Sequence, residues 1–283
     1  MTYCGISGNY SATYLWTGYI QEFKVYKGVA KYVNDFFPAS TNPNLLPETP
    51  SGIAYGSDLT KVTEGAVTFD GSGDYLKTPD SADFDMGTGD FTLECWVNSI
   101  DDSDYQGVFG SSDYDDDMVI LQINNAGLLR FTNPTTIDQT GTTDLQDGRW
   151  HHIVMCRSGT TLKGFVDGRE EISTTYSSSI DWGHSGNSIV IGTVDETDYP
   201  GQYQYKGYIS NLRLVKGTAL YTSNFTPSPG PLAAVTNTKL LCCQSNTSAV
   251  TSSVAPDAGT GTALLNAPLS STPFAVIAPG DTS

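Results

Sequence analysis

The sequence is poor in basic residues and in histidine. Lys and Arg total 14 against 31 Asp and Glu, which gives a formal net charge of −17, and there are three His. Phosphate binding needs clustered Lys and Arg, so this balance excludes nucleic acid as a direct partner. It also disfavours anionic membrane surfaces, whereas it favours solubility and repulsion between copies.

Long apolar runs and helical periodicity are both scarce. No run is long enough to span a membrane as a helix, so we expect no membrane insertion. The first residues carry neither a basic nor an apolar leader pattern, and we expect no cleaved secretion signal. The 29 Gly and 14 Pro separate short alternating runs, which is typical of antiparallel strands in a sandwich or barrel.

The cysteines show no metal-binding spacing. There are five, at Cys4, Cys95, Cys156, Cys242 and Cys243, and the odd count favours unpaired apolar residues over a disulfide framework. A disulfide stays open as the alternative. Adjacent residues of a strand point to opposite faces, so Cys242 and Cys243 are expected on opposite sides.

One stretch occurs twice. The sequence GYISNLRLVKGTALY at 207–221, followed by NFTP at 224–227, matches GYIQEFKVYKGVAKY at 18–32, followed by FFP at 36–38. At a constant shift of 189 positions (207 − 18), nine of twenty-one residues coincide. Such repeats decide how a fold is divided. We expect the closing strands of one domain at 1–38, a linker at 39–59, a complete domain at 60–235, and a strand with a Ser/Thr/Ala/Pro-rich tail at 236–283.

The clearest strand covers residues 89–97. Its odd-numbered residues from Phe91 to Val97 are apolar and share one face, while Thr92, Glu94 and Trp96 share the other. Further strands are expected at 66–70, 75–76, 150–156, 162–170, 188–192, 207–215 and 238–243, and a hairpin at 118–123 and 127–131. Asp167-Gly168 is a strong signal for a tight turn.

Five separated motifs, at 90–97, 147–154, 162–168, 191–192 and 207–214, occur in an order that resembles a laminin-G-like domain of the concanavalin A-like jelly-roll superfamily. The resemblance implies an all-β fold, an antiparallel two-sheet jelly-roll sandwich with a partial second copy at the N-terminus. The variant with KGTALY at 216–221 and NFTP at 224–227 resembles repeats of virion structural proteins of marine tailed phages. The residues expected to face the core are Phe69, Phe91, Leu93, Val97, Ile120, Phe131, Ile153, Met155, Phe165, Ile189, Ile191, Ile209 and Leu212, with Trp150 also buried.

Catalysis is not expected. Relatives that cleave glycans carry Glu-x-Asp-x-Glu on one strand, which sets two carboxylates side by side, and this sequence has no such triplet. Its best strand holds only Glu94. His151 and His152 belong to a motif that is structural in the family, and we expect one to pack inside and the other to face out.

Two acidic patches are candidates for Ca²⁺, which prefers several carboxylate and carbonyl oxygens on loops. The alternative is that these acidic loops are simply solvated, and no cofactor is required. The candidate ligands are Asp101, Asp102 and Asp104 in the first patch, and Asp113, Asp115, Asp116 and Asp117 in the second.

Two aromatic stretches are candidates for carbohydrate binding, in which an exposed ring stacks on a sugar beside polar groups. The alternative is that these rings cover loop edges or line a subunit contact. The candidate residues are Trp182, His184 and Asn187 in the first stretch, and Tyr199, Tyr203 and Tyr205 in the second.

The N-terminal half copy leaves three interpretations open. Residues 1–50 belong to a longer repeat chain, or they donate strands to a neighbouring copy through Tyr19, Ile20, Phe23 and Val25, or they form a small hairpin module. The sequence as a whole favours a non-enzymatic virion structural protein, such as an outer decoration, fibre or tail-associated subunit. It would contact other virion proteins or copies of itself, and also host surface glycans. We expect it on the virion exterior after synthesis in the host cytoplasm; the alternative is an extracellular or cell-surface lectin that binds carbohydrate, with or without Ca²⁺.

Overall fold

The computed structural model describes residues 65–99, 104–112, 118–183, 188–194, 202–228, 230–245, 249 and 252–254, and the backbone of 265–267. The N-terminal copy and its predicted strand-donating residues, Tyr19, Ile20, Phe23 and Val25, lie outside this part of the chain. Within it, no helix is long and apolar enough to cross a membrane.

Strands make up almost all of the regular structure in the described residues. One short 3-10 helix, η1 (Ala82–Phe84), accompanies them. The strands are β1 (Val67–Asp70), β2 (Tyr75–Lys77), β3 (Asp85–Gly87), β4 (Phe91–Ser99), β5 (Gln106–Ser111), β6 (Ile120–Ile123), β7 (Leu128–Thr132), β8 (Asp138–Asp144), β9 (His151–Ser158), β10 (Thr161–Val166), β11 (Arg169–Thr175), β12 (Ile180–Asp181), β13 (Ile189–Ile191), β14 (Lys206–Lys216), β15 (Thr238–Cys242), β16 (Ser252–Val254) and β17 (Leu265–Ala267).

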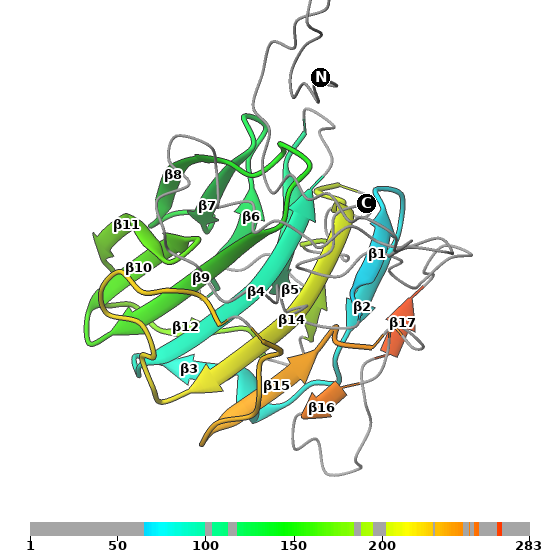
Figure 1. Ribbon diagram of the computed structural model, residues 1–283. Helices are drawn as coiled ribbons and strands as arrows, with labels where there is room; N and C mark the ends of the chain where they lie inside the picture. Colours follow the sequence, from blue (N-terminus) through cyan, green and yellow to red (C-terminus); the bar gives the residue numbers. More distant parts are fainter. Residues whose placement is uncertain are drawn as a thin grey trace, which may run out of the picture.

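The strands form two antiparallel sheets that face each other, which confirms the predicted sandwich (Figure 1). The first sheet has the order β11-β10-β9-β4-β14-β15-β16, and β1 also pairs with β14. The second sheet has the order β17-β2-β13-β5-β6-β7-β8, and β12 pairs with β3 apart from both. Both sheets therefore extend past residue 235, since β15, β16 and β17 are part of them.

The central core lies between the two sheets. The alternation predicted for β4 is confirmed, because Phe91, Leu93, Cys95 and Val97 belong to the central cluster while Trp96 belongs to a separate one. Every residue predicted to be in the core is buried. All but one of them face the interior between the sheets.

Phe165 is the exception. It is buried, but it packs on the outer face of the first sheet with Val154 and Cys156, where Phe225 covers it. The prediction that Phe165 faces the central core was wrong, since its neighbours Leu162 and Val166 both point inward and alternation places Phe165 on the opposite side.

Trp150 is buried in a satellite cluster on the same outer face, together with Ala66, Trp96 and Tyr208. We predict that Trp150→Ala lowers the free energy of unfolding by about 3 kcal/mol, the lower end for loss of a buried aromatic ring, because this cluster is small and lies away from the central core. Urea unfolding followed by circular dichroism measures the change. An unchanged transition midpoint would contradict the packing role.

The central strand β14 has a local irregularity at Ser210 and Asn211. Its register with β4 shifts between Ser210 and Arg213, and Asn211 has a positive φ of 51°. On the side away from β4, β1 pairs with residues 206–209 and β15 pairs with residues 212–215. The irregularity therefore lies where one neighbouring strand stops and the other begins.

Candidate functional site

Two of the predicted sugar-binding aromatics lie in the core. Trp182 is fully buried, contacts the rings of Phe91 and Phe109 edge-on at centroid distances of 5.4 and 5.1 Å, and donates its Nε1–H to the carbonyl of Val119 at 2.9 Å. Tyr205 is also fully buried, against Phe69. The expectation that these two rings are exposed is corrected, because packing between the sheets occupies their faces.

Tyr203 is placed differently. It is partly buried, and its ring meets that of Tyr105 edge-on with a centroid distance of 6.2 Å. Its carbonyl accepts a hydrogen bond from the amide of Gly107 at 2.8 Å, which ties the loop before β14 to the start of β5. The other predicted residues of this kind, His184, Asn187 and Tyr199, lie outside the described residues.

An arginine contacts one ring of this tyrosine pair. The guanidinium carbon of Arg130 lies 5.1 Å from the centre of the Tyr105 ring, a cation–π distance. Arg130 also donates from Nε and Nη2 to the two carboxylate oxygens of Asp138, at 2.7 and 2.9 Å. This hydrogen bonding lowers the pKa of Asp138. We call Tyr105, Tyr203, Arg130 and Asp138 the tyrosine rim.

The sequence analysis named Tyr203 as a candidate but named neither Tyr105 nor Arg130. They stand 98 and 73 positions away from it (203 − 105 and 203 − 130), and only the sheet order brings them together. A signal was present, since Tyr105 directly follows the first acidic patch.

The predicted Ca²⁺ ligands adjoin this rim in the chain. Asp104 is exposed, and its carboxylate accepts a hydrogen bond from the amide of Tyr105 at 2.7 Å. Among the described residues, no group of three or more His, Cys, Asp or Glu is arranged to hold a metal ion. The other six predicted ligands, Asp101, Asp102, Asp113, Asp115, Asp116 and Asp117, lie outside those residues, so the Ca²⁺ site stays a prediction.

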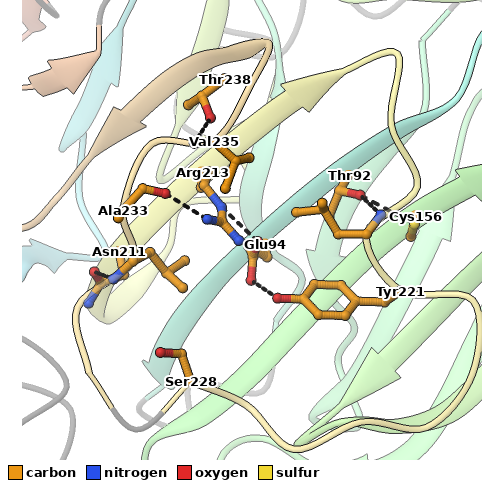
Figure 2. A network of polar contacts seen from close by, with 12 residues as sticks. Thr92, Glu94, Cys156, Asn211, Arg213, Tyr221, Ser228, Ala233, Val235 and Thr238 are labelled. Atoms are coloured by element: carbon orange, nitrogen blue, oxygen red, sulfur yellow. Dashed lines mark hydrogen bonds and ion pairs between the residues drawn. The ribbon is translucent and has the colours of Figure 1, made fainter.

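A second polar cluster lies on the outer face of the first sheet. It centres on Glu94 of β4, which is fully buried (Figure 2). Arg213, directly opposite on β14, donates from Nε at 2.9 Å and also from Nη2 to the same carboxylate oxygen. The hydroxyl of Tyr221 donates to the other oxygen at 2.9 Å, and Nε2 of His152 lies 3.1 Å from it.

These partners fix the charge state of the cluster. Burial disfavours the charged carboxylate, but the hydrogen bonds and charges of His152 and Arg213 outweigh burial and lower the pKa of Glu94. Burial and the neighbouring Glu94 carboxylate both raise the pKa of Tyr221, which keeps its hydroxyl protonated as a donor. Glu94 is therefore an ionised, fully engaged carboxylate and not a proton donor.

The chain after β14 covers this cluster, and we call residues 218–228 the strap. It passes in front of the first sheet in Figure 1. The strap is fixed by hydrogen bonds from Leu220 N to Thr92 Oγ1 and from Phe225 N to the Gly168 carbonyl, both 2.9 Å. The rings of Tyr221 and Phe225 stack at 3.8 Å over this face. The outer face of β4 and β9 is thus occupied by the protein's own chain.

Both neighbouring histidines are buried, which corrects the expectation that one faces out. The ring of His151 lies between two carboxylates, with Nδ1 2.8 Å from Asp167 and Nε2 3.2 Å from Asp147. Burial disfavours the charged ring, yet these hydrogen bonds and charges outweigh it and raise the pKa of His151. His151 thus joins the turns that flank β9 and β10.

This arrangement predicts a pH dependence of stability. A raised folded-state pKa stabilises the protein fully below the unfolded pKa of about 6.5, and this contribution is lost as the pH rises through the folded pKa. We expect wild type to exceed His151→Asn in unfolding free energy by more at pH 5.5 than at pH 9. Urea titrations at both pH values test this, and a difference that is equal or larger at pH 9 would contradict it.

Comparison with known proteins identifies the family of this fold. A laminin G-type family model, described as the concanavalin A-like lectin/glucanases superfamily, matches residues 70–220, more than half of the chain. The chain belongs to this superfamily. The laminin-G-like resemblance of the sequence is thereby confirmed, and the concanavalin A-like domain includes both the tyrosine rim and Glu94.

Several solved structures are similar to this concanavalin A-like domain. A Bacteroides ovatus protein described as a candidate carbohydrate-binding protein has 19% identity and a TM-score of 0.48, over 64% of this chain and 51% of its own. Domains LG4-5 of the mouse laminin α1 chain have 21% identity and a TM-score of 0.41, over 59% of this chain and 45% of theirs. The SAP-like pentraxin of Limulus polyphemus has 15% identity and a TM-score of 0.43, over 58% and 80%. This chain thus spans about half the length of the Bacteroides ovatus protein. No curated protein matches the chain in sequence.

Proposed function

We propose that this protein is a non-enzymatic carbohydrate-binding module whose ligand contacts the tyrosine rim. The observation that carries the proposal is the pair of Tyr105 and Tyr203, whose partly buried rings have centroids 6.2 Å apart. The two residues lie on loops that connect the sheets, and Arg130 lies over the Tyr105 ring. Tyrosine combines an apolar ring with a polar tip, which suits the mixed surface of a sugar. The superfamily includes lectins, which gives the proposal a second support.

The charge of the protein favours a neutral glycan over an anionic one as the ligand. The net charge is −17, and Arg130 is already paired with Asp138, so an anionic sugar would meet repulsion. Neutral hydroxyls would instead donate to carboxylate oxygens such as those of Asp104. If the acidic patches hold Ca²⁺, their ligands are Asp101, Asp102, Asp104 and the aspartates at 113 and 115–117, and the ion would take sugar hydroxyl oxygens as further ligands.

The covered face supports a role without catalysis. Glycoside hydrolysis needs two carboxyl groups flanking the scissile bond, one able to donate a proton. Glu94 is ionised, paired with Arg213 and covered by the strap, and no second acidic residue alternates with it on β4.

A glycan array followed by calorimetry tests the rim. We expect the full chain to bind a neutral glycan, and Tyr203→Ala or Tyr105→Ala to weaken that binding about tenfold, the value for loss of one aromatic contact of roughly 1.4 kcal/mol. Tyr75→Ala, a partly buried tyrosine on β2, is the matched control and should leave affinity unchanged. Absence of glycan binding, or equal binding by all variants, would refute the proposal. Loss of binding on adding a chelator would assign a Ca²⁺ requirement.

A second candidate function is assembly in a virus particle, and the repeat favours it. Of the repeated residues, the described copy uses Tyr221 and Phe225 for the strap and Gly207 for the contact between β14 and β4. The repeat thus preserves residues that build this part of the fold, as expected for modules arranged in series on the outside of a virion. The solution mass of the protein with and without residues 1–50 tests this. Oligomers of the full chain that become monomers on truncation support it, and two monomers oppose it.

A further inference from the structure

Cys242 and Cys243 lie on the same side of their strand, contrary to the alternation expected from the sequence. Both are buried in the central core, and their Sγ atoms are 3.6 Å apart. The cause is the backbone of Cys243, whose φ is +60°. Left-handed backbone turns the chain at the end of β15 and brings the second thiol beside the first.

The irregularity of β14 holds this unusual backbone in place. Asn211 also has a positive φ, and its backbone N–H donates to the backbone carbonyl of Cys243 at 3.1 Å. Asparagine tolerates this conformation more readily than residues such as cysteine do. Cys243 thus has a strained backbone in the core and also places its thiol in contact with that of Cys242. Such strain is typical of sites with a chemical role.

We propose that Cys242 and Cys243 form a redox-sensitive modification site, at which the two thiols close to a disulfide by exchange with a small external disulfide. The thiolate of one cysteine attacks the external disulfide, which gives a mixed disulfide and releases one small thiolate. The thiolate of the other cysteine then attacks the protein sulfur of the mixed disulfide and expels the second small thiolate. The pair loses two protons and two electrons, and the external disulfide is reduced to two thiols.

The bond formed this way is a reversible one. Consecutive Cα atoms are about 3.8 Å apart across a trans peptide, below the usual range of about 4.4–6.8 Å for disulfides. A disulfide between neighbours is therefore strained and readily reduced, which is the property of regulatory rather than structural disulfides. This site is independent of the tyrosine rim and of the function proposed for it.

Access to the pair requires local opening of the sheet. Burial raises the pKa of the Cys242 thiol, so in the closed protein it is protonated and unreactive. However, β15 lies one strand from the edge of the first sheet, with only the three-residue β16 beyond it. Edge segments open at lower free energy than the centre of a sheet, and we expect oxidation to proceed through such opening.

Closure of the disulfide would also affect the hydrogen bonds of Asn211. The side-chain carbonyl of Asn211 accepts hydrogen bonds from Leu232 N at 3.0 Å and from Gln244 Nε2 at 2.7 Å. Moving the Cys243 carbonyl displaces Asn211, and Asn211 connects to the chain that follows the strap. The redox state of the pair is thus linked through Asn211 to Leu232 and Gln244.

The experiment treats the full chain with oxidised glutathione, with and without urea below the unfolding transition, followed by intact mass and peptide mapping. We expect a loss of two hydrogen atoms, a disulfide within the peptide that holds both cysteines, faster reaction in urea, and reversal by dithiothreitol. Cys95→Ala should keep the reaction and Cys242→Ala should abolish it. Unchanged thiols in urea, a lasting glutathione adduct without closure, or a bond between Cys95 and one of the pair would overturn the proposal.

Discussion

Replacing Glu94 with alanine should lower the free energy of unfolding by about 3–5 kcal/mol, the cost of breaking a buried ion pair from one side. The substitution leaves the guanidinium of Arg213 buried without its carboxylate, with the carbonyl of Ala233 as its remaining acceptor among the described residues. Tyr221 loses the acceptor of its hydroxyl at the same time. Urea unfolding at neutral pH measures the change.

Two companion variants make this result interpretable. Glu170→Ala removes a carboxylate paired with Lys163 at 2.7 Å on the surface, and should cost at most about 1 kcal/mol. Tyr221→Phe removes only the hydroxyl over Glu94, and should cost about 1–2 kcal/mol while the ion pair survives. If Glu94→Ala costs no more than Glu170→Ala, the buried network does not stabilise the fold.

Gly207→Ala is the second substitution with a large expected effect, about 3 kcal/mol or more. The φ of Gly207 is +139°, and an added Cβ would lie 2.1 Å from the carbonyl oxygen of Asn98 on the paired strand β4. Backbone strain of about 1–3 kcal/mol and a clash of about 1–3 kcal/mol therefore add up, because neither strand can move without breaking their pairing. Thermal and urea unfolding measure the loss.

Gly73→Ala is the matched control for this prediction. Its φ is also positive, at +82°, but nothing lies within 4 Å of the added Cβ. It should cost about 1 kcal/mol, the strain without the clash. Equal effects of the two substitutions would show that β4 and β14 yield to the extra methyl group. Gly207 is also one of the residues that the N-terminal copy shares, as Gly18.

Alternation along the chain made most of the fold predictable. β4 and β14 appeared nearly in full. The faces of β4 were assigned correctly because every second residue from Phe91 to Val97 is apolar. β8 was missed since its sequence, DQTGTTD, is polar and buries only Gly141, as suits a strand at the edge of a sheet. The side on which Cys243 lies was predicted wrongly, because its left-handed backbone breaks the alternation. Cysteine is not a residue type that indicates such a backbone.

The candidate site was predictable only in part, for a different reason. Glu94 was visible as the one carboxylate on the best strand, but His152, Arg213 and Tyr221 are 58, 119 and 127 positions away in the chain. Strand order alone decides which of the many distant polar residues meet. The prediction that Trp182 and Tyr205 are exposed was wrong. Aromatic residues occur both in cores and at binding surfaces, and composition does not distinguish the two.

The placement of β1 and β15 along one side of β14 makes the module suited to circular permutation and to insertion into other proteins. Both strands run antiparallel to β14, so the end of β15 comes beside the start of β1 at the irregularity of β14. There Ser210 Oγ donates to the Gly65 carbonyl at 2.7 Å, and the next amide, that of Asn211, donates to Cys243. The polypeptide from Gly65 to Cys243 thus enters the first sheet and leaves it at the same place, beside Ser210 and Asn211. A short peptide joining those two points would close the backbone from β1 to β15 into a ring. The ring could be reopened at the Gly148 or Gly159 turn to give new termini while keeping every pairing among β1 to β15.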